Sequence, residues 1–211
     1  SNILTVEYVA YYSVAVFISA VIEFPGRAMF QIVSPLVAKA INQNDDATLS
    51  SLLRKSANNL LLVSGFLFLL INLNLDDFYE WVNLGDYTVA LDVVLIVSVG
   101  KLFTMSMGCL NNIITNSKYY YYVFWFSNLS AILAVILNLY LIQRYGIIGA
   151  AYATLFVMVF INLLKILLVQ YRFKINPYGT ESIRTIVIVV LIYFLVSYIP
   201  IDYDPFTALV L

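Results

Sequence analysis

Long apolar runs alternate with short polar segments along the whole chain. The apolar runs cover residues 5–41, 52–73, 87–111, 119–142, 147–169 and 183–199, and a shorter run occupies 205–211. A helix needs about 20 residues to cross the ~30 Å hydrocarbon core of a bilayer. Since each complete run reaches or approaches that length, the pattern predicts six membrane-spanning helices and a truncated seventh. The expected fold class is an all-α integral membrane protein, a polytopic helical bundle of about seven transmembrane helices.

The first run is much longer than one perpendicular crossing requires, and Pro25, Gly26 and Pro35 interrupt it. Proline removes a backbone donor and bends a helix. Helices in lipid tolerate this when neighbouring groups satisfy the freed carbonyls. We expect one long, bent helix; the alternative is a pair of helices joined by a turn at Pro25 and Gly26.

The two ends of the chain bear on its organisation. The chain begins at Ser1 without a methionine and stops inside an apolar run at Leu211. We therefore expect it to be a piece of a larger membrane protein.

Composition supports the membrane class and excludes several functions. Of 211 residues, 63% are hydrophobic and 11% charged, and the mean hydropathy is +0.92. Soluble domains are about 45–50% apolar and about 25% charged, so a water-soluble enzyme is effectively excluded. There is no histidine and Cys109 is the single cysteine, which removes the commonest metal ligand and any thiolate metal cluster within the chain. No hydrolase triad, phosphate-cradling glycine loop or paired-carboxylate site is readable, so we expect no catalytic residues, no metal and no cofactor. The net charge is −1 without a basic stripe, which argues against nucleic acid as a partner.

Lysine and arginine are distributed unequally between the two ends of the predicted spans. One end carries Lys39, Arg54, Lys55, Lys118, Arg172, Lys174 and Arg184, whereas the other carries Arg144 together with acidic residues such as Asp76, Asp77 and Glu80. Short loops rich in Lys and Arg stay in the cytoplasm. We therefore expect the loops near 42–55, 112–118 and 170–184 to be cytoplasmic, and the first helix to run inward from the outside.

Charged residues inside the apolar runs are the candidate functional residues, because each needs a partner or a function in lipid. Glu23 and Arg27 lie four residues apart, in the order that favours an ion pair on one helix face. One interpretation is a self-neutralised pair that keeps a bent helix satisfied. The other is a cavity-facing arginine whose planar fork binds an anionic substrate such as a phosphate.

Asp92 and Lys101 are the charged residues of the third run. They lie nine residues apart and point to opposite sides of a helix, so they cannot neutralise each other. Lys101 lies at a depth comparable with Glu23 and is a candidate substrate-binding residue, the alternative being a structural tie to Glu23. Asp92 lies nearer the outer surface and is a candidate for ion coupling, although a structural role is favoured there.

Several motifs resemble one transporter family. Tyr11-Tyr12, Glu23-Phe24-Pro25, Ser34-Pro35-Leu36 and the polar break at 42–46 resemble the helix that opens the second lobe of flippases of the multidrug/oligosaccharidyl-lipid/polysaccharide (MOP) superfamily. Residues 145–154 (YGIIGAAYAT) look like the short turn and small-residue helix start of its polysaccharide exporters. The resemblance covers nearly the whole chain, and its motifs are degenerate.

This resemblance implies a fold and a function. The chain would be the second, C-terminal lobe of a MATE-like two-lobe transporter, with the N-terminal lobe missing. It would be a Wzx-type flippase in the bacterial cytoplasmic (inner) membrane. Such a flippase moves undecaprenyl-pyrophosphate-linked oligosaccharide for O-antigen or capsule synthesis by alternating access. Its partners would be that lipid-linked substrate, membrane lipids and the N-terminal lobe.

One departure narrows the substrate. Where a MurJ-type lipid II flippase has an arginine on this helix, the chain has Ala20, and Arg27 lies about two turns further along. This argues against lipid II and leaves Arg27, with Lys101 and Glu23, as the candidate substrate-binding set.

Two alternative functions stay open. A cation-coupled multidrug exporter of the same superfamily would depend on Asp92 or Glu23 as a buried carboxylate. A membrane enzyme of envelope polysaccharide synthesis would depend on the short acidic loop that holds Asp76 and Asp77.

Overall fold

The computed structural model describes residues 6–75 and 89–198, and about 89% of these residues are helical, with no strand among them. The all-helical class expected from the sequence is therefore confirmed. Four helical segments in this part of the chain are long and apolar enough to cross a membrane: Val9–Asn42, Asp46–Leu73, Tyr121–Phe173 and Thr180–Tyr198. The acidic loop with Asp76 and Asp77 and the apolar run at 205–211 lie outside the described residues.

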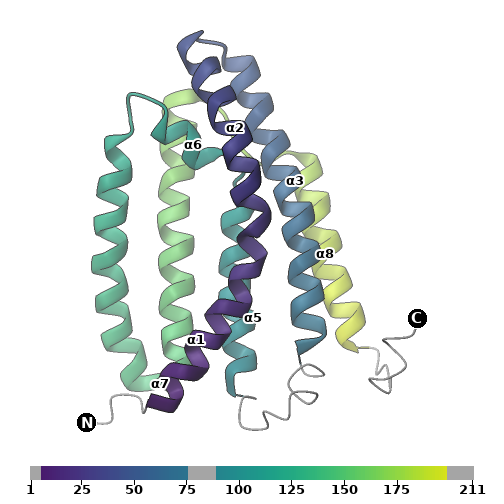
Figure 1. Cartoon of the computed structure of the whole chain (residues 1–211), viewed down its shortest axis with the longest axis vertical. Coiled ribbons are helices and arrows are strands. Elements are labelled where there is room, and N and C mark those ends of the chain that lie inside the picture. The colour runs from purple at the N-terminus through teal and green to yellow at the C-terminus, as the bar shows by residue number, and fades with distance from the viewer. Residues whose placement is uncertain (1–5, 76–88, 199–211) are drawn as a thin grey trace.

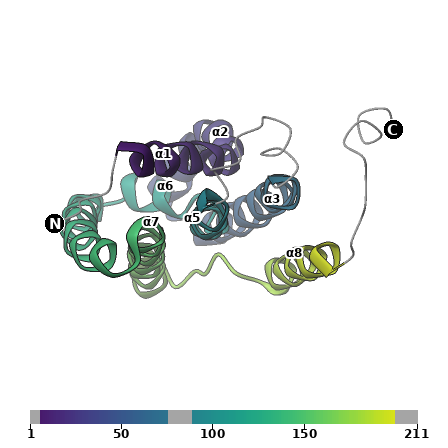
Figure 2. The same cartoon turned by 90° about the horizontal axis from the view of Figure 1, so that it is seen from below.

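The described elements form a bundle of roughly parallel and antiparallel helices around α5 (Figures 1 and 2). They are α1 (Val6–Ala20), the 3₁₀ turn η1 (Val21–Glu23), α2 (Phe24–Asn42), α3 (Asp46–Leu73), α5 (Val89–Met105), α6 (Leu110–Thr115), α7 (Tyr121–Phe173) and α8 (Thr180–Tyr198). α5 contacts α1, α3 and α7, whereas α8 packs on α3 at one edge of the bundle. The centre of the bundle is therefore the helix that carries Asp92 and Lys101.

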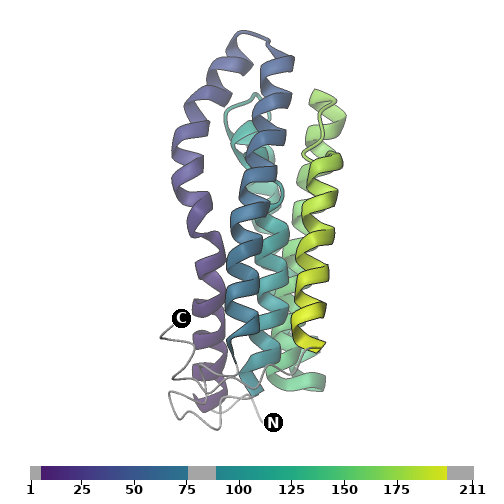
Figure 3. The same cartoon turned by 90° about the vertical axis from the view of Figure 1, so that its right-hand side faces the viewer.

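α1, η1 and α2 together make one long, bent helix, as expected, and not a pair of helices joined by a turn (Figure 3). Pro25 has no N–H to give the Val21 carbonyl four residues earlier. The Phe24 N–H bonds to the Val21 carbonyl instead, which tightens the helix into η1. Ser64 of α3 donates to the next carbonyl, that of Ile22, at 2.9 Å. The bend is thus satisfied by its own backbone and by a neighbouring helix.

α3 begins at a well-formed cap just after the polar break at 42–45. The Asp45 carboxylate accepts a hydrogen bond from the Thr48 N–H at 2.9 Å, the standard way to satisfy a free donor at a helix start. Hydrogen bonding by Thr48 lowers the pKa of the Asp45 carboxyl below its ordinary value. The polar segment predicted between the first two spans therefore forms a tight connection that sets where α3 starts.

The third apolar run, expected as one span over 87–111, is not one continuous helix. α5 ends at Met105, and a turn through Gly108 leads into the short α6. Gly108 has a φ of 59°, and a Cβ on it would collide with the backbone of Ala57 in α3. The Ser56 hydroxyl accepts the Cys109 N–H at 2.9 Å in the same place. Close approach of α3 therefore ends the helix earlier than the apolar pattern predicts.

α7 contains both the fourth and the fifth apolar runs. Its backbone reverses at Gly146, with φ 60° and ψ −135°, a conformation essentially restricted to glycine. Figure 1 shows the two arms side by side, and Phe126 of the first arm packs with Val157 and Ile161 of the second. Gly149 sits directly against the Leu141 carbonyl, where no larger residue would fit. The predicted turn at 143–146 is thus a helical hairpin held together by close packing.

Gly108→Ala should destabilise the protein, because Gly108 lies directly against the α3 backbone. Alanine at a positive φ is strained, and its Cβ would overlap the Ala57 backbone. We expect the free energy of unfolding to fall by about 2–3 kcal/mol, as for overpacked sites. A lower Tm of the full-length protein in detergent would measure this. Gly179→Ala is the matched control, since a Cβ there meets nothing within 4 Å. Equal effects of both substitutions would contradict the close approach of α3.

Candidate functional site

Glu23 and Lys101 form an ion pair between the bend of the first helix and α5. The Lys101 Nζ lies 2.8 Å from Glu23 Oε2, and the two side chains are 15% and 25% exposed. It is the one ion pair among the described residues, and it joins positions 78 residues apart in the chain. The structural tie between Lys101 and Glu23 considered above is therefore present. The self-neutralised pair of Glu23 with Arg27 is not.

Arg27 lies about one turn beyond this ion pair and has no carboxylate partner in the part of the chain that the structure describes. Its guanidinium is exposed and lies 5.3 Å from the centre of the Phe24 ring, within the range of a cation–π contact. The preceding Gly26 is buried against Met105 of α5. The bend thus anchors the backbone next to α5 and leaves the Arg27 charge on the surface of the bundle.

The three charges sum to one net positive charge. Glu23 and Lys101 neutralise each other, whereas Arg27 is uncompensated by any described acid. Arg27 also lies near the middle of the apolar helix Val9–Asn42. Arginine remains protonated at any physiological pH and offers a planar pair of donors to carboxylate or phosphate. The arrangement can bind an anion without any proton transfer.

Asp92 is not part of this group. It lies in the first turn of α5, exposed, and nine residues before Lys101, which is about 13 Å along the helix axis at 1.5 Å per residue. No described cation pairs with it. Asp92 thus lies apart from the other three charges, of which the structure pairs Glu23 with Lys101.

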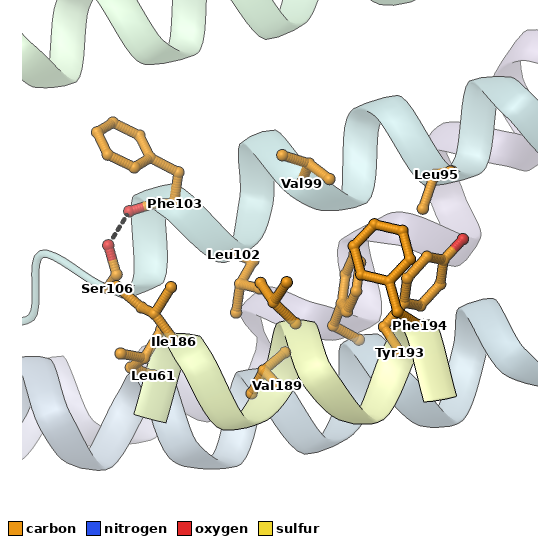
Figure 4. Close-up of a pocket in the computed structure, with 12 residues that line it drawn as sticks. Leu61, Leu95, Val99, Leu102, Phe103, Ser106, Ile186, Val189, Tyr193 and Phe194 are labelled. Atoms are coloured by element: carbon orange, nitrogen blue, oxygen red, sulfur yellow. Dashed lines mark hydrogen bonds between the residues drawn. The ribbon is translucent and has the colours of Figure 1, made fainter. Parts of the chain in front are cut away.

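A mostly apolar cavity of about 390 Å³ lies between α3, α5 and α8 (Figure 4). Its walls are Leu61, Phe68, Leu95, Val99, Leu102, Phe103, Ser106, Ile186, Val189, Val190, Tyr193 and Phe194. The Ser106 hydroxyl donates to the Phe103 carbonyl at 2.7 Å and also lies 3.0 Å from the Tyr178 hydroxyl. Lys101 does not line the cavity: it is turned about 200° around α5 from Val99 and Phe103 and about 100° from Leu102, which do.

Buried polar side chains also surround α5 and serve packing. Ser98 donates to the Ser19 hydroxyl at 3.3 Å, and Asn162 donates to the Thr104 hydroxyl at 2.9 Å. Asn162 is 5% exposed. Gly100, near Thr104, packs against Met158 of α7. These contacts fix the helices that present the charges.

A second, polar pocket lies at the Lys- and Arg-rich end of the bundle. It has a volume of about 320 Å³, and Lys118 and Arg172 line it together with Asp46 and Tyr119. In the sequence these two cations indicate only the orientation of the chain. Their juxtaposition depends on the α7 hairpin, because they lie at its two ends, and no spacing in the sequence indicates it.

No metal-binding cluster of three or more His, Cys, Asp or Glu side chains occurs among residues 6–75 and 89–198. The chain matches no protein-family model, no curated protein and no solved structure.

Lys101→Ala should destabilise the protein, because it leaves the Glu23 carboxylate partly buried without a partner. We expect a loss of about 1–3 kcal/mol in the free energy of unfolding, measured by thermal or denaturant unfolding of the full-length protein in detergent. Adding Glu23→Gln should recover part of that loss.

Arg27→Ala is the matched stability control, since Arg27 has no ion pair in the described chain, and it should lower stability by no more than about 0.5 kcal/mol. A double-mutant cycle isolates the pair, with an expected coupling of about 0.5–3 kcal/mol. Additive effects of Lys101→Ala and Glu23→Gln would show that the pair does not stabilise the bend.

Proposed function

We propose that the chain is the C-terminal lobe of a flippase for undecaprenyl-pyrophosphate-linked oligosaccharide, with seven spans in a MATE-like arrangement. The observation that carries this proposal is Arg27, an uncompensated arginine near the middle of a bent apolar helix. A cation near the middle of an apolar helix, without a partner among the described residues, favours an anion from elsewhere as its ligand. A pyrophosphate supplies that anion, and the family resemblance of the sequence supplies its class.

Each charged residue has a separate role in the proposed binding of the substrate. Arg27 offers two parallel donors to one phosphate, which gives direction as well as charge. Glu23 neutralises Lys101 while the site is empty, and we propose that the Lys101 ammonium turns to the phosphate when the substrate binds. Tyrosine and asparagine side chains meet sugar hydroxyls, while the undecaprenyl chain remains in lipid. Rocking of this lobe against the N-terminal lobe then exposes the site alternately to each side of the membrane.

The proposed location is the bacterial inner membrane, with the loops near 42–55, 112–118 and 170–184 in the cytoplasm. The α2–α3, α6–α7 and α7–α8 connections lie at one end of the bundle, and the reversal at Gly146 lies at the other (Figure 1). Within the described residues the first end holds Lys39, Arg54, Lys55, Lys118, Arg172, Lys174 and Arg184, and the second holds Arg144. The positive-inside rule supports this orientation.

The multidrug-exporter alternative requires a carboxylate that is free to bind a cation. Glu23 already holds Lys101, and Asp92 is exposed near the start of α5. Glu23 is therefore the less suitable carboxylate, and this alternative depends on Asp92, which pairs with no described cation.

Arg27→Ala should reduce flipping at least about tenfold, because removing a charge-assisted phosphate contact costs about 1.5–3 kcal/mol. Transport of lipid-linked oligosaccharide by the full-length protein in proteoliposomes measures this. The control is Arg144→Ala, which should retain full transport. Arg144 lies beside the reversal at Gly146, and its guanidinium is 4.3 Å from the centre of the Tyr140 ring. If the Arg27→Ala variant flips substrate at the wild-type rate, Arg27 has no role in transport.

Native mass spectrometry of the full-length protein in mild detergent should detect a co-purified undecaprenyl-linked oligosaccharide and identify its glycan. Efflux of a cationic dye that is lost in Asp92→Asn would instead establish a multidrug exporter. Metal-dependent sugar incorporation that depends on Asp76 and Asp77 would establish an enzyme of polysaccharide synthesis.

A further inference from the structure

The polar pocket at the Lys- and Arg-rich end brings together three separate parts of the chain. The α2–α3 connection, the α6–α7 connection and the last residues of α7 all contribute to it. Its lining residues are Ile41, Asn44, Asp46, Leu49, Ser117, Lys118, Tyr119, Arg172 and Phe173. The α7 hairpin is what assembles it, since Lys118 and Arg172 flank the start of the first arm and the end of the second.

The two cations face a common aromatic ring. The Lys118 Nζ lies 5.4 Å and the Arg172 guanidinium 5.0 Å from the centre of the Tyr119 ring. Phe173 holds that ring by an edge-on contact at 5.8 Å. Neither cation has a carboxylate within ion-pair distance in the described chain. Asp46 is the one acidic residue in the lining, so the pocket keeps a net positive charge.

The surroundings of the pocket belong to the membrane interface. Tyr120, Tyr121, Trp125 and Tyr171 are all exposed on α7 or immediately before it. Amphipathic rings of this kind settle at the level of lipid headgroups. Further along the two arms the exposed residues, such as Ile132, Val135 and Leu163, are apolar and suit the acyl region. A lipid lying against this hairpin therefore has its headgroup level with the pocket.

We propose that this pocket binds the phosphate of an anionic phospholipid from the adjacent leaflet. Arg172 supplies a planar fork for the phosphate oxygens and Lys118 a second, flexible charge, while Tyr119 holds both in place. Basic pockets between helices at the cytoplasmic end of membrane proteins recognise such headgroups. The site is at the end of the bundle, separate from Arg27 near the middle of its helix, and the proposal does not depend on the transported substrate.

The test is lipid binding by the full-length protein in detergent, followed by native mass spectrometry during titration with cardiolipin, phosphatidylglycerol or phosphatidylcholine. We expect the two anionic lipids to bind in preference to phosphatidylcholine. Lys118→Gln with Arg172→Gln should weaken cardiolipin binding by about tenfold or more, as expected for losing two charge-assisted contacts. The control, Lys55→Gln with Arg184→Gln, removes one exposed Lys and one exposed Arg from the same end and should bind like the wild type.

A single substitution and a competition experiment complete the test. Lys118→Gln alone changes an exposed side chain, and it should weaken cardiolipin binding measurably even if the double substitution fails to fold. Millimolar inorganic phosphate should displace little cardiolipin. Equal binding of phosphatidylcholine, unchanged binding by Lys118→Gln, equal loss in the control pair, or full displacement by inorganic phosphate would each overturn the lipid site.

Discussion

The ion pair between Glu23 and Lys101 is the interaction on which the arrangement of the remaining charges depends. Two opposite charges 2.8 Å apart and mostly shielded from water are expensive to separate. Because one partner belongs to η1 and the other to α5, the pair fixes the bend of the first helix against the central helix. Gly26 completes the contact by letting the first helix approach Met105 of α5 closely. Arg27 then lies outside the contact, where its charge is available.

The bend itself is a solution to a backbone problem. Pro25 removes the donor that the Val21 carbonyl would receive in a regular helix, and η1 supplies another from Phe24. Ser64 adds a bond to the Ile22 carbonyl from α3. In lipid every carbonyl must find such a partner inside the protein. The irregular turn is therefore stable where α3 and α5 both pack against it, and the ion pair forms at this position.

Much of the fold could be predicted from the apolar pattern, because helices in lipid must be long and continuous. The bent first helix and the reversal near Gly146 follow from proline and glycine at those positions. The early end of α5 could not be predicted, since it results from α3 approaching Gly108. The charged candidate residues could be identified from the sequence, because a charge inside an apolar run is costly in lipid. The partner of Glu23 stayed open between Arg27, which local spacing favours, and Lys101, and only tertiary packing decides for Lys101.

α5 separates two chemically different regions. On one side it presents Lys101 to Glu23, and on the other Val99 and Phe103 line the mostly apolar cavity against α8. A charge facing that cavity would have to give up water for hydrocarbon, at a cost that no described partner offsets. Placing Lys101 away from the cavity avoids this cost and keeps the cavity suited to hydrocarbon. α5 thus presents a charged group and an apolar surface in different directions, so that neither region has to accommodate the other.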